Sequence, residues 1–346
     1  MNISATELQP LIASIFHAAG CSAAEAARVA QHLVEANLVG HDSHGVIRTG
    51  PYVRWLKGGQ VLADREVEVA FENESIAVID GRFGFGQTVG VQAMELGIAK
   101  AKRQGVAVIA LRNAGHLGRI GAWPQMVAEA GLVSVHFVNT SGAGILVAPF
   151  GGTERRLSAN PIAAGVPRPG RTPILLDMSA CTIAEGKIKV ALNRGSQVPA
   201  GCIIDSHGEP TTDPQAFYAS PPGAILPIAG HKGYGLAVLC EVLAGALTGG
   251  GCSNPVHAGR LANGMLSVIL DPAVFQPGDA FHAEIDRFIE WVKSSATTTP
   301  NGEILMPGDV EERTRAARLR EGIELDPTTW SQIAEAAASV GATLRR

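Results

Sequence analysis

The feature that most constrains the fold is an alternation of short apolar runs with segments of helical periodicity after residue 60. The runs are enriched in β-branched residues, which is typical of buried strands, and the segments between them repeat apolar residues at helical spacing. The predicted strands are 67–70, 76–79, 106–111 and 132–138, and the predicted helices are 91–103 and 122–130. This alternation predicts an α/β fold.

Helices are expected near both ends of the chain. Ser4 and Glu7 form a capping-box pattern, and apolar residues then recur at helical spacing up to Gly20. The same start signal recurs at 22–25 and predicts a second helix that ends at Gly40. Further helices are predicted at 52–56, 310–320 and 330–340, and further strands at 174–176 and 265–270.

The charge balance excludes some classes of partner. The 346 residues include 28 Lys and Arg against 32 Asp and Glu, which gives a net charge of -4. Because there is no basic excess, we expect neither nucleic acid nor a membrane surface as a partner. A small anionic substrate is compatible with this balance, but it needs a local cationic pocket.

Cysteine usage and hydropathy indicate a cytoplasmic protein. The five Cys contain no Cys-x-x-Cys pair, so neither a disulfide framework nor a structural zinc site is expected. We expect no export signal ahead of the first helix. The longest apolar stretch, 236–247, is interrupted by Glu241 and is too short to span a bilayer, so it predicts a buried helix.

The residues most suggestive of chemistry follow the second helix, in the sequence His-Asp-Ser-His-Gly-Val-Ile-Arg at 41–48. If the chain after Gly45 begins another helical turn, His44 and Arg48 lie on one face. An imidazole can then give or take a proton beside a planar cation suited to binding a carboxylate. The cluster predicts a site for a small carboxylate.

The glycine-rich motif at 84–90 follows a strand and precedes a helix, which invites comparison with a dinucleotide fingerprint. We reject a Rossmann match. The third glycine comes one residue late, and the next strand ends in Leu111 and Arg112, where an acidic residue should hold the ribose. A tight turn that packs a helix on a sheet is the better interpretation.

Other motifs also have a functional and a structural interpretation. His41, His44 and His116 could bind a metal, but no third ligand stands at a suitable spacing, so we expect no metal. The Gly-His-Lys-Gly-Tyr-Gly motif at 230–235 suits phosphate binding at a helix start, and equally a glycine-softened helix start with a solvated Lys. The polar run 139–142 follows a predicted strand, where ligands collect, although a simple polar turn is more common.

Six ordered motifs together make the chain resemble the second type of malate/L-lactate dehydrogenase family, whose members are NAD(P)-dependent oxidoreductases without a Rossmann fold. The resemblance covers essentially the whole chain and points toward the bacterial hydroxycarboxylate dehydrogenase branch. The motifs are Gly-His-Asp-Ser-His-Gly at 40–45, Asn-Ala-Gly-His-Leu-Gly-Arg at 113–119, Leu-Asp-Met-Ser at 176–179, Pro-Thr-Thr-Asp-Pro at 210–214, His-Lys-Gly-Tyr at 231–234 and Pro-Gly-Asp at 307–309.

The resemblance implies roles for particular residues. His44 is implied as the proton donor, with Ser43 beside it, Arg48 on the substrate carboxylate and His116 lining the cleft. Asn160 is implied in substrate binding. The residues implied to contact NAD or NADP are Leu176, Asp177, Met178, Ser179, Ala180, Cys181, Thr182, His231, Lys232, Pro307, Gly308 and Asp309.

The resemblance also implies an architecture. It indicates a non-Rossmann NAD(P)-binding α/β fold with mainly helical N- and C-terminal parts, and a homodimer. The expected domains are 1–60 with 285–346 as a helical domain, 61–130 as a small α/β domain and 131–284 as the cofactor-binding domain.

Two departures from the family pattern bear on the substrate. Ala159 stands where the family usually has Thr, so a hydroxyl near the substrate is missing. Ala114 and Gly115 are small, and we expect them to leave room for a larger 2-oxo acid. Arg168 and Arg171 lie in a loop that could meet a 2′-phosphate, although a solvated loop is the commoner outcome.

The predicted reaction is hydride transfer between NAD(P)H and a 2-oxo carboxylate, giving a 2-hydroxy carboxylate. His44, titrating near neutrality, is expected to supply the proton, and Arg48 to align the carbonyl. Three alternatives stay open: a reductase of cyclic ketimines such as piperideine or pyrroline carboxylate, a metal-dependent hydrolase that uses the histidines, and a protein that binds NADH without catalysis.

Overall fold

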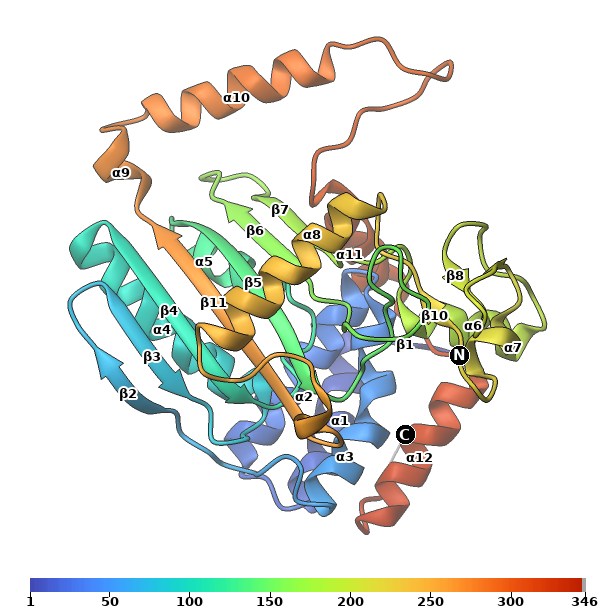
Figure 1. Cartoon of the computed structure of the whole chain (residues 1–346). Helices are drawn as coiled ribbons and strands as arrows, with labels where there is room; N and C mark the ends of the chain where they lie inside the picture. Colours follow the sequence, from blue (N-terminus) through green and yellow to red (C-terminus); the bar gives the residue numbers. More distant parts are fainter. Residues whose placement is uncertain (344–346) are drawn as a thin grey trace.

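The computed structural model of the protein describes residues 1–343, and a seven-stranded sheet runs through its centre (Figure 1). Adjacent strands are antiparallel, except that β3 and β4 run parallel. In spatial order the strands are β2 (Glu68–Glu72), β3 (Ile76–Asp80), β4 (Val106–Ala114), β11 (Leu261–Leu270), β5 (Val133–Gly142), β6 (Ile162–Val166) and β7 (Ile174–Met178). The α/β fold predicted from the alternation is confirmed.

Helices cover both faces of this sheet (Figure 1). α4 (Gly86–Gln104) and α5 (Ala122–Glu129) pack on one face, where Val89, Met94 and Trp123 are fully buried against alternate residues of β4. The other face carries α8 (His231–Cys240), which continues as the π-helical segment η3 (Glu241–Ala246) against β5 and β11. Over most of β4 every second side chain is buried, so this side of the sheet offers an apolar face on which the helices pack.

Three local predictions were wrong. α4 begins at Gly86, not at 91, because Gly86 and Gly90 allow a close approach that larger residues would block. β5 runs to Gly142, so residues 139–142 form the end of a strand and not a turn. The stretch 157–226 holds far more than one strand: β6, β7, α6 (Glu185–Arg194), α7 (Pro214–Tyr218) and a small sheet of β10 (Ala224–Ile225), β8 (Ile203–Ile204) and β9 (Pro210–Thr211).

A helical layer forms where the two ends of the chain meet. The N-terminal helices α1, α2 and α3 pack with α11 and α12 around a core that includes Leu8, Phe16, Tyr52 and Ile333. The capping box at Ser4 is present, as predicted. Bounds are α1 (Ala5–Ala18), α2 (Ala23–Leu38), α3 (Thr49–Lys57), α11 (Asp309–Glu321), α12 (Pro327–Ser339) and the paired strands β1 (Asn2–Ile3) and β12 (Ile323–Glu324). The three-domain division stays a prediction.

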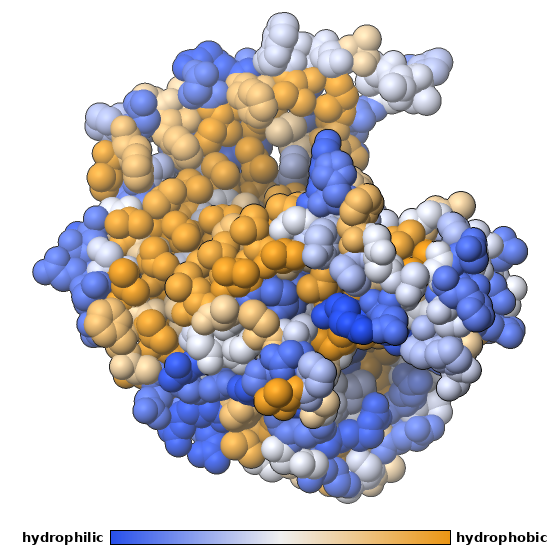
Figure 2. All heavy atoms as spheres, in the orientation of Figure 1, coloured by the Kyte–Doolittle hydropathy of each residue, from blue (hydrophilic) through white to orange (hydrophobic). Residues whose placement is uncertain are grey.

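The long apolar helix is buried on one side only, which corrects the prediction for 236–247. Ala237, Cys240 and Ala244 face the sheet, whereas Val238, Leu239, Val242 and Leu247 are exposed. Figure 2 shows a broad hydrophobic area across this face of the molecule. Exposed apolar side chains also lie on an arm that includes α9 (Pro272–Phe275) and α10 (Ala280–Lys293): Phe275, Phe288 and Trp291.

Within residues 1–343, none of the helices has the length and apolar character needed to cross a membrane. The short 3-10 helix η4 (Pro255–His257) precedes β11 and contacts β5.

Candidate active site

The histidine-rich loop between α2 and α3 consists of two 3-10 turns, η1 (Asp42–His44) and η2 (Val46–Arg48). The buried Asn37 holds both turns: its amide nitrogen donates to Asp42 Oδ1 (2.6 Å), and its amide oxygen accepts from the Val46 N–H (2.8 Å). A Cβ at Gly45 would overlap this amide. The helical turn predicted after Gly45 is therefore present, in 3-10 form.

Arg318 on α11 provides a second restraint on this loop. Its Nη1 and Nη2 donate to Asp42 Oδ1 (2.6 Å) and Oδ2 (3.0 Å), a two-point contact that fixes orientation as well as distance. His41 lies between two carboxylates, at 3.9 Å from Asp177 and 3.5 Å from Glu311. Both contacts with α11 tie the loop to the helix that starts at the Pro-Gly-Asp turn.

His44, His116, Ser43 and Arg48 come together, as predicted. The rings of His44 and His116 are nearly parallel, with centroids 5.6 Å apart. His44 Nδ1 lies 3.0 Å from Ser43 Oγ, and Arg48 Nε donates to the Ser43 carbonyl (2.6 Å). Among the described residues the Arg48 guanidinium makes no ion pair, and its two terminal nitrogens have no hydrogen-bond partner. These nitrogens are available to a substrate anion.

The pKa of His44 is lowered to about 3. The largest cause is burial of the imidazole, and the smaller causes are its electrostatic interactions with Arg48, His41 and Arg119. Burial, Arg48 and His44 lower the pKa of His116 well below its ordinary value. Both imidazoles are therefore neutral near pH 7. This corrects the expectation that His44 titrates near neutrality, because the spacing of residues 44 and 48 showed the cation but not the burial.

The glycine motif at 84–90 holds His116 in place. Gly115 donates its N–H to the Gly84 carbonyl (2.8 Å), and a Cβ at Gly115 would lie 2.6 Å from that oxygen. A Cβ at Gly86 would overlap the carbonyl of His116. The motif is thus a turn that packs a helix, as the sequence indicated, and it packs that helix directly against the cleft histidine.

The prediction that Ala114 and Gly115 leave room for a larger substrate was wrong. Ala114, the last residue of β4, is fully buried in the core that the sheet forms with α4 and α5. The space beside Gly115 is filled mainly by backbone atoms. Small residues at these positions allow close packing of the chain and do not widen the cleft.

Sequence reasoning missed Tyr52 and Gln87. Tyr52 Oη lies 2.7 Å from His116 Nδ1, and Gln87 Nε2 donates to that hydroxyl at 3.0 Å. Both residues are almost completely buried. Tyr52 follows Arg48 by four residues, and Gln87 is the polar residue inside the glycine motif, so helical spacing and motif polarity could have indicated them.

The three segments predicted to bind the cofactor lie side by side. Leu175, one residue before the first segment, donates its N–H to the Pro307 carbonyl (3.0 Å). Farther along, Ala180 accepts from the Ile228 N–H (3.0 Å), and Thr182 donates its N–H to the Leu226 carbonyl (2.9 Å). The segment that contains Leu226 and Ile228 follows β10 and leads directly into His231 and Lys232, which are exposed at the start of α8.

The members of these segments differ in what their side chains can contact. Leu176 is exposed, Met178, Ser179 and Thr182 are partly exposed, and Ala180 and Cys181 are buried. Asp177 accepts from the Gly121 N–H (2.8 Å). Asp309 accepts from Lys293 Nζ (3.2 Å) and the Met306 N–H (2.9 Å), which closes the turn around Gly308.

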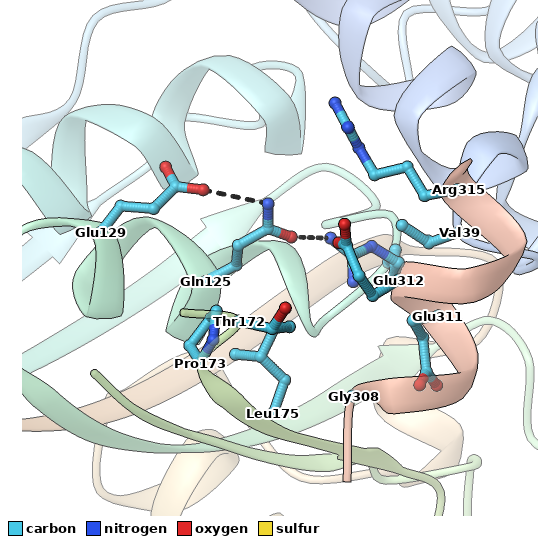
Figure 3. A pocket seen from close by; sticks show the side chains of 11 residues that line it. Val39, Gln125, Glu129, Thr172, Pro173, Leu175, Gly308, Glu311, Glu312 and Arg315 are labelled. Atoms are coloured by element: carbon cyan, nitrogen blue, oxygen red, sulfur yellow. Dashed lines mark hydrogen bonds between the residues drawn. The ribbon is translucent and has the colours of Figure 1, made fainter. Parts of the chain in front are cut away.

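A pocket of about 360 Å³ opens beside this turn (Figure 3). α11 lines one side of it with Glu311, Glu312 and Arg315, while Gln125 and Glu129 approach from α5. The remaining lining residues are Val39, Arg119, Thr172, Pro173, Leu175 and Gly308. Gly308 has a φ of 101°, and a Cβ there would lie 3.2 Å from the Pro173 carbonyl, so a glycine lets this turn pack closely against the backbone at the pocket edge.

Within residues 1–343, the Asn160 side chain makes no hydrogen bond to His44 or His116. It is fully buried, with Nδ2 donating to Glu241 Oε1 (2.9 Å) and the Ala237 carbonyl (3.0 Å), and Oδ1 accepting from Ser158. The amide is therefore committed to α8 and η3. The neighbouring Ala159 carbonyl accepts from the Ala180 N–H (2.9 Å), so this segment supports the cofactor segment through its backbone.

Arg168 and Arg171 both pair with Asp286 of α10, at 3.1 and 3.2 Å. Their charge is thus shared with a carboxylate. In the part of the chain from 1 to 343, no three His, Cys, Asp or Glu side chains converge in a way that could hold a metal ion.

Comparison with known proteins gives a consistent result. The family model for malate/L-lactate dehydrogenase matches residues 3–334. Hydroxycarboxylate dehydrogenase B of Escherichia coli (strain K12) is 40% identical over 341 residues, covering 97% of this chain and 94% of that protein.

Two solved structures are similar in fold and in sequence. The sulfolactate dehydrogenase of Methanocaldococcus jannaschii has a TM-score of 0.87 and 35% identity, and the match covers 99% of this chain and 98% of that chain. The Δ1-piperideine-2-carboxylate reductase of Pseudomonas syringae pvar. tomato has a TM-score of 0.84 and 30% identity, covering 97% of this chain and 100% of that one.

Proposed function

The chain belongs to the malate/L-lactate dehydrogenase family and is an oxidoreductase, and we propose that it interconverts a 2-oxo carboxylate and the matching 2-hydroxy carboxylate with a nicotinamide cofactor. The observation that carries this proposal is the pairing of two neutral imidazoles with Arg48, whose terminal nitrogens have no partner within residues 1–343. The relatives are dehydrogenases and reductases, so the hydrolase alternative has no support.

Arg48 binds the substrate carboxylate through its two terminal nitrogens. The guanidinium lies beside His44, so a carboxylate bound there brings the neighbouring carbonyl carbon and oxygen close to the imidazole. The bound anion also offsets the charge of Arg48, one of the causes that keep the pKa of His44 low. Substrate binding therefore favours uptake of the proton that reduction requires.

In the oxidative direction the neutral His44 accepts the hydroxyl proton. Its low pKa leaves the ring ready as a base at any pH near neutrality. Ser43 Oγ, 3.0 Å from Nδ1, orients the ring. His116, stacked 5.6 Å away, closes the other side of the substrate oxygen.

The residues present fit a nicotinamide dinucleotide. The pocket beside the Gly308 turn can take one end of the cofactor, and the exposed Lys232 at the start of α8 provides a cation for its phosphates. We assign Leu176, Asp177, Met178, Ser179, Ala180, Cys181 and Thr182, with His231, Lys232, Pro307, Gly308 and Asp309, to this contact surface. The bound nicotinamide supplies or accepts the hydride.

We propose NAD in preference to NADP. Three carboxylates, those of Glu129, Glu311 and Glu312, line the pocket. They outnumber its two guanidinium groups, Arg119 and Arg315, and Arg315 is already paired with Glu35 (2.9 Å). A 2′-phosphate would add negative charge beside these three carboxylates. Arg168 and Arg171, already paired with Asp286, do not offset it.

The assay that tests this function is a panel of 2-oxo acids and cyclic imines, each with NADH and NADPH, followed by loss of the reduced cofactor's absorbance. Reduction of a 2-oxo acid supports the proposal, and oxidation of NADH by none of the panel contradicts it. Faster reduction of piperideine carboxylate than of phenylpyruvate would favour the ketimine reductase. That second candidate is kept because the Pseudomonas relative reduces such a compound by name and Arg48 suits either carboxylate.

We also propose that the protein is a homodimer that uses the exposed face of α8 and η3. Val238, Leu239 and Val242 form a stripe at helical spacing, and a contiguous exposed stripe of this kind marks an interface. In sedimentation, the wild type should have twice the 35.9 kDa chain mass and Leu239→Glu the monomer mass. Phe71→Glu, on the edge strand β2, is the matched control. A monomeric wild type would contradict the proposal.

The cytoplasm is the proposed location, because all five cysteines are free thiols in the structure and three of them are buried.

A further inference from the structure

We propose that Gln87 is a positioning residue: through Tyr52 it holds the imidazole of His116 in the tautomer that carries its proton on Nε2. The inference rests on the proposed function, since it concerns the cleft histidine of that reaction. It gives a role to the polar residue of the glycine motif, which the fold alone does not require.

The orientation of the Gln87 amide is fixed by two contacts of one atom. Its Nε2 lies 3.0 Å from Tyr52 Oη and 3.3 Å from the backbone carbonyl of His116. A carbonyl oxygen can only accept, so the amide atom that faces it has to be the nitrogen. The opposite orientation would set two oxygens against each other in a site where Gln87 is fully buried.

This orientation fixes the direction of the next hydrogen bond. The Tyr52 hydroxyl accepts an N–H from Gln87 and has a single proton of its own to donate. Its other neighbour is His116 Nδ1, at 2.7 Å. The hydroxyl proton points away from the Gln87 N–H, and within residues 1–343 the only acceptor that it can reach is Nδ1.

A second donor reaches the same ring nitrogen. The backbone N–H of Gly118 points at His116 Nδ1 from 3.3 Å, and a backbone N–H can only donate. Nδ1 therefore has to be unprotonated, and the two donors share its single in-plane lone pair. The proton of the neutral ring is therefore on Nε2.

The tautomer decides what His116 offers to a substrate. Nε2 lies on the opposite side of the ring from Tyr52, and within residues 1–343 it has no hydrogen-bond partner. An N–H fixed there can stabilise the negative charge that develops on the substrate oxygen, whereas the other tautomer would present a lone pair and repel it. A doubly protonated ring would set Nδ1–H against the Gly118 N–H, which agrees with the lowered pKa of His116.

The experiment is nitrogen-15 NMR of the histidine rings in the full-length protein, with the His116 signals assigned by their loss in His116→Asn. In the wild type we expect the unprotonated nitrogen of His116 to be Nδ1. In Gln87→Met, Tyr52 is free to turn its proton away, so the signals should shift toward a mixture of tautomers. In the same variant kcat should fall about 10-fold to 100-fold, with the KM for NADH unchanged.

Gln92→Met is the matched control on the same helix. Gln92 accepts from the Val67 N–H (2.9 Å) and contacts neither histidine, so this substitution should leave the His116 signals and kcat unchanged. Tyr52→Phe gives a second route should Gln87→Met fail to fold, because it keeps the ring and removes the hydroxyl. Adding Gln87→Met to Tyr52→Phe should then cause no further loss of kcat.

Two results would overturn the inference: a wild-type His116 protonated on Nδ1, or a Gln87→Met protein whose His116 spectrum and kcat both match the wild type. The NMR measurement needs no substrate. A protein with the expected tautomer that reduces no 2-oxo acid would therefore count against the proposed function and not against the role of Gln87.

Discussion

The two cleft histidines face each other but are held by different means. His44 sits on a loop whose shape depends on side chains, namely Asn37 and the Arg318 to Asp42 contact. His116 follows a central strand and is held by backbone packing of Gly115 and Gly86. A side-chain contact can be removed without unfolding the protein, whereas a backbone contact cannot. Damage to the backbone packing beneath His116 should therefore appear as lost stability, and damage to the side-chain contacts of the His44 loop as lost activity.

The largest expected effect is on the backbone side. In Gly86→Ala the new methyl group would overlap the His116 carbonyl, and neither α4 nor the strand end can move without disturbing the core. We expect the free energy of unfolding to fall by about 3 kcal/mol, measured by denaturant titration. Gly235→Ala in α8 is the control, because a Cβ there meets open space, and it should not destabilise. If the two variants were equally stable, backbone packing at Gly86 would not be what holds His116.

Arg48→Lys tests the loop side. The charge stays but the two-point contact is lost, so KM for the 2-oxo acid should rise and kcat should fall. Together these should lower kcat/KM about 30-fold, which corresponds to about 2 kcal/mol, while the melting temperature stays close to that of the wild type. The same change at the exposed Arg54 on α3 is the matched control. Unchanged kinetics would exclude Arg48 as the carboxylate ligand.

The pH dependence separates the two directions of the reaction. With the pKa of His44 lowered to about 3, the neutral base is fully present near pH 7, so kcat/KM for oxidation should be level from about pH 5 to about pH 8. Reduction needs the protonated ring, whose fraction falls as the pH rises above the pKa. Its kcat/KM should therefore fall about tenfold per pH unit across the same range.

A variant can check the cause of this pKa shift. Arg48→Met removes the largest charge effect on His44, so the pH at which reduction begins to decline should move upward. Initial rates at constant ionic strength measure both profiles, and Arg54→Met should reproduce the wild-type curves. A rise in the oxidation rate between pH 6 and 8 would show instead that the acting group titrates near neutrality, and would contradict the burial argument.

The sequence predicted the parts of the molecule that depend on short-range signals. Caps at Ser4 and Ser22 marked the first two helices, and the spacing of His44 and Arg48 indicated their shared face. The meeting of His44 with His116 came from the family resemblance and not from spacing. It depends on how α2 packs against α4 and on the contact of Tyr52 in α3 with His116, which local patterns do not encode.

Long-range and inward-facing features escaped prediction for physical reasons. The central position of β11 depends on pairing with β4 and β5, strands more than a hundred residues earlier in the chain. Asn160 looked like a substrate ligand, yet its amide bonds inward to Glu241. The exposed side of α8 was predicted to be buried because apolar composition does not show whether a helix is covered on one side or on all sides.

The smallest expected effect concerns the contact between α11 and the loop. Arg318→Met removes the two bonds to Asp42 and the bond to the Asn37 carbonyl, but the Asn37 amide still holds the Asp42 carboxylate, and Arg315 still pairs with Glu35. Because Asp42 is half exposed, the contact contributes only about 1 kcal/mol. We expect kcat/KM to fall about fivefold as the His44 turn becomes less fixed.

Arg320→Met on the same helix is the control for this last change, since Arg320 pairs only with its exposed neighbour Glu321. Measured side by side, the two variants should have melting temperatures within a few degrees of each other, and only Arg318→Met should lose activity. A loss of stability without a loss of kcat/KM would mean that the loop is positioned without α11. The contrast between a side-chain-held and a backbone-held histidine would then rest on Asn37 alone.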